Sequence, residues 1–334
     1  MEISCPNCGA NLKVRRDAVI HTCDYCGTAI QVSKMIAKPE ASKKEKEKEF
    51  VIKDHYIVRC NYPPGQAKNL LVAWISKVPG TPSDFELDVN IHSQKLKFYP
   101  LWVGEYAADS QYTGLDNWPE FHSPAYDKTG WFEHVSYYKK EENGRVVREY
   151  QIPLPGLKLE KIPEYLREYF VTTTGKEYFD IKHVKNFSGE IIDSTIKFDE
   201  AKNQMKQKVL EFQEKEIHKE VKTINTRNDN IDERAVFYIH FPVYEIKYTY
   251  KGKDYKALID GSNGRIIHVE TPITTGFRAK TITLGAIHVA IGIILLLFYG
   301  LFPFFAIAGG IGIIIIGIIF FAVNFRKKAA EKQL

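Results

Sequence analysis

The chain has 334 residues, of which 44% are hydrophobic and 26% are charged, and its formal net charge is +5. This length is enough for one sizeable domain with small appendages, and the small basic excess does not indicate a nucleic-acid-binding protein. The first ten residues are polar and contain cysteine, so they lack the apolar core of a signal peptide.

Two Cys-x-x-Cys-Gly knuckles lie near the N-terminus, with Cys5 and Cys8 in the first and Cys23 and Cys26 in the second. Four thiolates in two pairs can surround one Zn²⁺ tetrahedrally, and the glycine after each pair permits a tight turn. Some thirty residues cannot bury a sufficient core unaided, so the metal is needed for folding. The spacing therefore predicts a structural zinc ribbon over residues 1–33. Disulfides are the alternative in an oxidising compartment.

The spacer between the knuckles is long enough for a β-hairpin of residues 11–14 against 19–22. The charges of the ribbon cancel and Tyr25 is its only aromatic residue, so it lacks the basic stripe with stacking rings of a nucleic-acid surface. We therefore favour a protein-docking role over nucleic-acid binding. A purely structural end-cap is the third interpretation.

Residues 34–50 form a linker with many Lys and Glu and no apolar periodicity, which is typical of a solvated segment. We expect the ribbon to move relative to the body for this reason.

The body, residues 51–277, mixes helix and strand patterns without the regular alternation of a parallel sheet, which predicts an α+β domain. Aromatic residues are abundant, and most suit a packed sheet; a groove for an extended partner strand is the functional alternative. A Pro-aromatic pattern occurs twice, at 99–102 and 241–244, which two similar halves would explain. The expected helices cover 64–78, 163–170 and 198–224, and the expected strands cover 51–60, 95–112, a hairpin of 131–138 and 145–152 around Asn143-Gly144, and a meander of 244–250, 255–259 and 266–269.

The body shows no nucleophile–base motif and no phosphate-binding loop, so we expect a non-enzymatic protein without catalytic or cofactor-binding residues. Glu105, Asp109 and Asp116 follow one expected strand, but acidic residues there are usually solvated. The histidines are scattered without metal-ligand spacing, and Cys60 is best explained as a small core residue.

Residues 281–325 contain no Lys, Arg, Asp or Glu and are interrupted near the middle by Gly300 and Pro303. The two halves, about 281–300 and 304–325, are each long enough to span a bilayer, which predicts a transmembrane helical hairpin followed by a basic tail at 326–334. Basic residues flank the hairpin on both sides, so the positive-inside rule places both termini in the cytoplasm of a multi-pass cell-membrane protein.

Small residues predict the contact between the two helices. Gly285, His288 and Gly292 share one face of the first helix, and Ala308 and Gly312 form a small-xxx-small pair on the second. His288 is the ionisable side chain within this region, apart from the weakly acidic Tyr299. It suggests a proton relay, but a neutral imidazole bonded to a carbonyl is the simpler interpretation.

The knuckles, Cys-Pro-Asn-Cys-Gly and Cys-Asp-Tyr-Cys-Gly, resemble the zinc ribbons of general transcription factor B. Together with the charged linker, the Pro-aromatic strands, the closing β-hairpin and the apolar tail, the whole layout resembles TFIIB-type zinc ribbon-containing membrane proteins of bacteria and archaea. The resemblance implies association with membrane-stress systems, including stomatin-like (SPFH) partners. No catalytic residues transfer from it.

These observations favour a membrane-anchored zinc-ribbon adaptor that recruits cytoplasmic or membrane proteins to the lipid bilayer. A membrane-tethered nucleic-acid-binding or transcription-linked protein is one alternative, and an accessory subunit of a membrane enzyme or transporter is another. The sequence does not fix the oligomeric state, so a homo-oligomer remains open.

Overall fold

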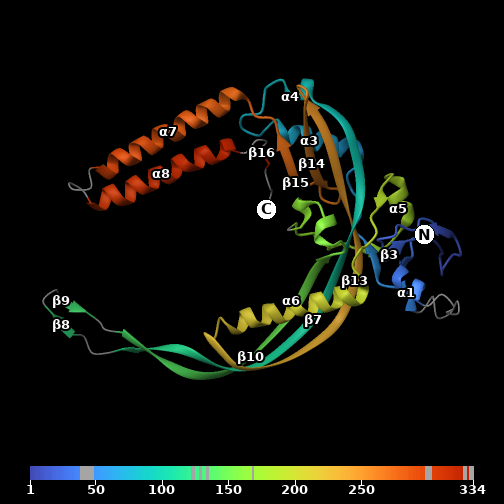
Figure 1. Ribbon diagram of the computed structural model, residues 1–334, viewed down its shortest axis with the longest axis horizontal. Coiled ribbons are helices and arrows are strands. Elements are labelled where there is room, and N and C mark those ends of the chain that lie inside the picture. The colour runs from blue at the N-terminus through green and yellow to red at the C-terminus, as the bar shows by residue number, and fades with distance from the viewer. Residues whose placement is uncertain are drawn as a thin grey trace.

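The computed structural model describes residues 1–37, 49–121, 125–127, 130–132, 135–167, 169–297, 303–325 and 329–330. It has a mixed α+β architecture in which antiparallel strands dominate, as the sequence predicts. A four-cysteine unit lies at the N-terminal end and two long helices lie at the C-terminal end (Figure 1).

The strands of the described residues form one large sheet and three small ones. Their bounds are β1 Glu2–Ser4, β2 Asn11–Lys13, β3 Ile20–Thr22, β4 Ala29–Gln31, β5 Val51–Ile52, β6 His55–Ile57, β7 Asn90–Phe121, β8 Ala125–Asp127, β9 Gly130–Phe132, β10 Val135–Pro155, β11 Glu177–Tyr178, β12 Glu190–Ile191, β13 Thr223–Tyr250, β14 Lys253–Asp260, β15 Ile266–Thr271 and β16 Ala329–Ala330.

Among the described helices, α3, α6, α7 and α8 are long, and the others span one or two turns. Their bounds are α1 Val32–Ala37, α3 Pro64–Ile75, α4 Phe85–Asp88, the 3₁₀ turns η1 Leu159–Lys161 and η2 Glu164–Leu166, α5 Ile181–Asn186, α6 Phe198–Ile217, α7 Thr275–Leu297 and α8 Pro303–Phe325.

The large sheet has the order β10-β7-β13-β14-β15-β16, with β6 added parallel to β13. The strands β13, β14 and β15 form the antiparallel meander that the alternating aromatic pattern predicts. The two Pro-aromatic segments pair directly, with Phe241 opposite Tyr99 and His240 opposite Pro100. The repeated pattern therefore marks neighbouring antiparallel strands at the centre of one sheet.

Three long strands, β7, β10 and β13, continue past the core as a curved arm with α6 along it (Figure 1). The predicted hairpin around Asn143-Gly144 is wrong. Both residues lie inside β10, opposite Thr113 and Tyr112 of β7, and the strand continues from Val135 to Pro155. The sequence Asn-Gly favours a tight turn. Here Gly144 instead leaves room for the Tyr112 side chain, because a Cβ on Gly144 would lie 2.4 Å from the hydroxyl oxygen of Tyr112.

The side chains of β13 pack into two apolar clusters, because successive side chains of a strand point to opposite faces of the sheet. Ile239, Phe241 and Val243 pack with the segment that contains η1 and η2. Tyr244 and Ile246 pack on the opposite face with α3. The core is therefore divided by the large sheet.

Two helix predictions need correction. Among the described residues of the range 163–170, Glu164–Leu166 form the 3₁₀ turn η2 and the others are not helical, and the long helix α6 ends at Ile217 instead of continuing to residue 224. On α6 the buried stripe follows i, i+4 spacing and takes in Gln213, while Phe212 is 38% exposed. Gln213 satisfies its amide inside the core by donating to Ser110 Oγ and Val146 O, both at 3.0 Å.

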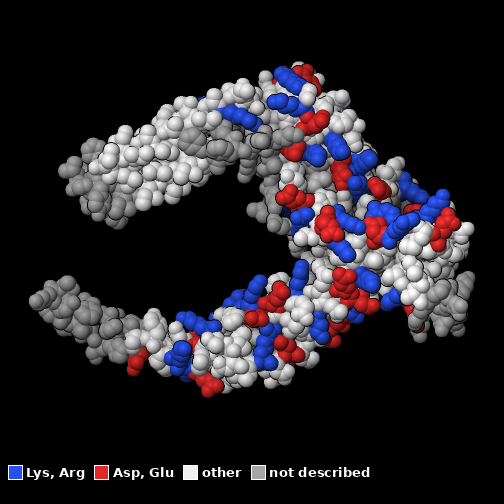
Figure 2. Space-filling model, in the orientation of Figure 1, with Lys and Arg blue, Asp and Glu red and all other residues white. Residues whose placement is uncertain are grey.

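The apolar C-terminal helices α7 and α8 pack against each other. Within the described residues, α7 is the one helix long and apolar enough to cross a membrane, and the apolar stretch Gly309–Phe320 of α8 is shorter. On the face of this pair that Figure 2 shows, the Lys and Arg side chains of the described residues lie near the attachment to the body.

Glycine contacts hold the two helices close together. A Cβ on Gly292 would lie 2.8 Å from Gly310 O, and a Cβ on Gly317 would lie 2.9 Å from Gly285 O. The predicted small face of α7 is therefore confirmed. On α8 the contacts are made by Gly310 and Gly317, whereas the predicted Gly312 has nothing within 4 Å of such a Cβ. The side chain of Ala308, the other member of the predicted pair, lies outside the described residues.

Candidate metal centre

The two knuckles have the same backbone design. In each, the N–H of the following glycine donates to the carbonyl oxygen of the first cysteine, Gly9 to Cys5 and Gly27 to Cys23, both at 2.9 Å. Gly9 and Gly27 have φ of +78° and +77°, a left-handed conformation that L side chains rarely adopt. The glycine after each Cys-x-x-Cys pair therefore closes the turn, as the sequence predicts.

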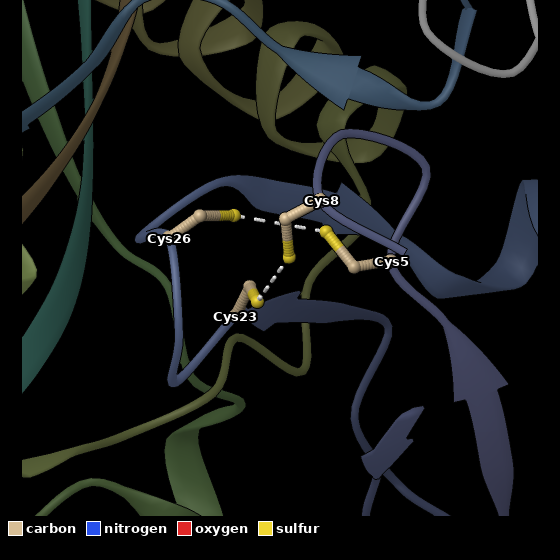
Figure 3. A group of neighbouring side chains, drawn as sticks. All are labelled: Cys5, Cys8, Cys23 and Cys26. Atoms are coloured by element: carbon tan, nitrogen blue, oxygen red, sulfur yellow. Dashed lines mark hydrogen bonds between the residues drawn. The ribbon is translucent and has the colours of Figure 1, made fainter. Parts of the chain in front are cut away.

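The turns aim the four thiols at one point (Figure 3). Cys5 Sγ lies 3.7 Å from Cys26 Sγ and Cys8 Sγ lies 3.8 Å from Cys23 Sγ, and all four sulfur atoms lie within 4.8 Å of one another. A tetrahedral ion with bonds of ~2.3 Å to sulfur separates its ligands by ~3.8 Å. The four cysteines are therefore consistent with a single metal site, as predicted.

Polar neighbours favour a thiolate at one corner of this site. Burial opposes ionisation, but hydrogen bonds from Thr28 outweigh it and lower the pKa of Cys26 to about 6. Burial raises the pKa of Cys23 to about 12 in the absence of a metal. A cation bound at the centre supplies the charge that stabilises the other thiolates, so metal binding here releases protons.

The strands around the site differ from the predicted hairpin of residues 11–14 with 19–22. β2 pairs with β1, and β3 pairs with β4, so the two segments belong to different sheets. Each knuckle thus lies between the strands of its own pair. This follows from the near-identical sequence of the two knuckles, each of which closes a local hairpin.

The expected motion of the ribbon relative to the body is also wrong. β4 pairs with β5, which is the first strand after the linker, so a three-stranded sheet β3-β4-β5 joins the ribbon to the body. The Ile20 N–H donates to Ser194 O at 3.2 Å, and the Ser194 N–H donates to Ile20 O at 3.1 Å. Ile20 and Ala29 are buried in the same cluster as Trp102 of β7.

A buried pair of side chains, His21 and Asp193, joins the ribbon to the body. His21 Nδ1 lies 3.0 Å from both carboxylate oxygens of Asp193, and Thr22 N–H donates to the same carboxylate at 3.4 Å. The side chains of His21 and Asp193 are 7% and 11% exposed. The sequence did not indicate this pair, because its members are 172 positions apart and neither belongs to a motif.

Two more histidines meet behind the second knuckle. His55 Nε2 lies 3.0 Å from His240 Nδ1, and the His55 ring stacks on Phe179 with centroids 4.2 Å apart. Phe179 in turn lies against Gly27, where a Cβ would come within 2.9 Å of its ring. Burial, and after it electrostatic repulsion from the neighbouring His240, holds the pKa of His55 well below its ordinary value. Burial lowers the pKa of His240 to about 4. These histidines are neutral core groups near pH 7.

The carboxylates considered in the sequence do not converge on a site. Asp109 accepts two bonds from Arg145, at 2.7 and 2.6 Å, and these bonds lower its pKa. Glu105 accepts from Gln151 at 3.4 Å, while Asp116 lies opposite Lys140 in the ladder. Cys60 is buried in the core, as expected.

His288 bonds within its own helix. Its Nδ1 lies 2.7 Å from Leu284 O, and its ring lies 5.5 Å from that of Phe320 on α8. This geometry agrees with the simpler interpretation of His288, in which the imidazole satisfies a backbone carbonyl.

Comparisons of the chain with protein-family models, with curated proteins and with solved structures find no match in any of the three.

Proposed function

We propose that this protein is a membrane-anchored scaffold, in which a zinc-stabilised ribbon completes a rigid body and a long β-arm presents a docking surface to partner proteins. The observation that supports this proposal most directly is the arm of β7, β10 and β13, which extends beyond the core (Figure 1). Its distal part exposes large aromatic side chains: Trp118 is 41%, Tyr137 67% and Tyr138 47% exposed. Exposed aromatic residues on a projecting element are typical of protein-interaction sites.

The metal of the ribbon is zinc in this proposal. Four cysteines select a soft or borderline cation, and a set of four protein ligands leaves no open position for catalysis. Metal analysis should give about one zinc per chain, and Cys8→Ser should reduce it. Cys60→Ser is the control because Cys60 does not belong to the cluster of four sulfur atoms. Equal zinc in both variants would refute the four-thiol site.

α7 and α8 together form the membrane anchor in this proposal. Antiparallel packing of two glycine faces suits close helix contact in lipid. The chain also returns to the body after α8, because Ala329 and Ala330 of β16 pair with Thr271 and Glu270 of β15. Both ends of the pair then lie on one side of the bilayer, and the basic flanks make that side the cytoplasm. Reporters fused to the two termini should both be cytoplasmic, and opposite locations would refute the hairpin.

Site-specific photo-crosslinking tests the scaffold function itself. A photoreactive residue at Tyr137 on the arm should capture a discrete partner in native membranes. Tyr25 on the ribbon is 65% exposed and tests the ribbon as a docking site, and Leu87 of α4, 87% exposed, is the control position. Capture from Tyr25 alone would transfer the docking role to the ribbon. Absence of any adduct from Tyr137, with purification of the chain alone in mild detergent, would refute the arm as a docking surface.

The partner class that the sequence resemblance implies is a stomatin-like membrane protein, and the captured partner can be compared with it directly. The same experiment addresses nucleic acid. Adducts that are sensitive to nuclease and that weaken steeply with salt would favour the transcription-linked alternative.

A further inference from the structure

A cavity of about 240 Å³ lies in the body, away from the metal centre. It lies between the large sheet and the segment around η1 and η2 and opens to solvent on one side, and most of its lining residues belong to one apolar cluster. The volume corresponds to about eight liquid water molecules at ~30 Å³ each and is slightly below the ~300 Å³ of small drug-sized sites. The apolar walls that matter for the argument are Leu101, Leu157, Ile162, Leu166, Val171 and Phe241.

The tyrosines that border the cavity use their hydroxyl groups elsewhere. Tyr99 donates to Glu245 Oε1, and Tyr169 donates to Asp260 Oδ2 at 2.7 Å. Pro153 and Pro155 contribute ring carbons and have no N–H to donate. These groups therefore offer apolar surface to an occupant.

Two cations complete the lining, Arg167 after η2 and Lys208 on α6. Within the described part of the chain, neither side chain forms an ion pair or a hydrogen bond, whereas many other cations of the body do. Arg167 is exposed and Lys208 is half-buried. An occupant that complements this site has an apolar body and an anionic end, because a carboxylate can accept from the guanidinium while the rest displaces water from the walls.

We propose that this cavity binds a single-chain carboxylate amphiphile, a fatty acid, with its chain against Leu101, Leu166 and Phe241 and its carboxylate at Arg167 and Lys208. The volume suits one acyl chain or part of it. The proposal is independent of the scaffold function, because it rests on the cavity alone.

The test uses the full chain in phosphatidylcholine nanodiscs, with empty nanodiscs subtracted. Dansyl-labelled undecanoic acid is the probe, and its methyl ester is the uncharged comparison. Arg167→Gln and Lys208→Gln should each weaken binding of the acid about fivefold, as expected for one partly exposed ion pair, and should leave the ester unchanged. Lys206→Gln is the matched control, because Lys206 is an exposed α6 residue that does not line the cavity.

A cavity-filling variant, Leu166→Trp, should weaken binding of both probes. The charge variants keep the test decisive if this variant does not fold, because they change only exposed or half-buried side chains. No saturable binding of the acid, or equal weakening by Lys206→Gln, overturns the proposal.

Discussion

Asp193 is the residue whose loss should most specifically release the ribbon from the body. Its buried carboxylate is shared by His21 Nδ1 at 3.0 Å and Thr22 N at 3.4 Å. Asp193→Ala leaves both groups buried without this partner. Removing one member of a buried ion pair costs ~3–5 kcal/mol, and an unpaired buried neutral group costs ~1–3 kcal/mol. We take ~3 kcal/mol, which raises the equilibrium constant for local opening about 100-fold.

Hydrogen exchange followed by mass spectrometry measures this opening in the zinc-loaded chain. Amides of β3 and β5 should exchange about 100-fold faster in Asp193→Ala, because their ladder depends on the docked ribbon. Amides of β14, in another part of the sheet, should be unchanged. Asp193→Asn retains an acceptor oxygen and should give a smaller increase, about fivefold.

Two results would refute this reasoning. Unchanged exchange in β3 and β5 would show that the carboxylate does not hold the ribbon in place. An equal increase in β14 would show that Asp193 supports the fold as a whole and has no local role at the junction.

Three other predictions test separate parts of the structure. Gly292→Leu should weaken the α7–α8 pair by ~1–3 kcal/mol, because the new side chain meets Ile314 and Gly310. Gly312→Leu should have little effect, because nothing lies within 4 Å of a Cβ there. Disulfide cross-linking between the helices measures the difference, and equal effects would refute the assigned α8 face. The free energy of unfolding should hold above pH ~6.5 and fall by up to ~1.4 kcal/mol per pH unit for each of His55 and His240 towards pH 4, because their lowered pKa values keep them neutral when folded while the unfolded chain takes up protons. His240→Gln should make that fall less steep in urea titrations at pH 7 and pH 5, and an identical slope would contradict the assignment. Asn143→Thr should change stability by less than ~0.5 kcal/mol, because Asn143 lies in a regular strand, whereas loss of a required turn residue would cost ~1 kcal/mol or more in the same titration.

The sequence patterns that succeeded are those in which nearby residues determine the outcome. The Gly-terminated knuckles place four thiols together, since each turn depends on only five consecutive residues. Pro64 begins α3 as predicted, because its missing N–H is not needed in the first turn of a helix. The alternating aromatic residues of β13 likewise predict the meander correctly.

The predictions that failed depended on a partner remote in the sequence. Asn143-Gly144 has a strong local preference for a turn, but pairing with β7 on one side keeps it extended. The residues 19–22 could pair with 11–14 by length, yet β3 is stabilised instead by β4 and by Ser194. The intrinsic preference of a residue for one backbone conformation is worth about 1 kcal/mol. The hydrogen bonds of a long strand pair and the burial of one strand face together contribute more than this.

By itself, the sequence determined the four-cysteine site, the α+β character of the body and a C-terminal apolar helix long enough to cross a membrane, because each follows from spacing or periodicity along the chain. Only the tertiary structure decided that the ribbon is docked through His21 and Asp193, that His55 meets His240, and that three strands continue into an arm. Those features depend on which distant segments become neighbours. That choice is made by the burial of shared apolar surface, which no local pattern records.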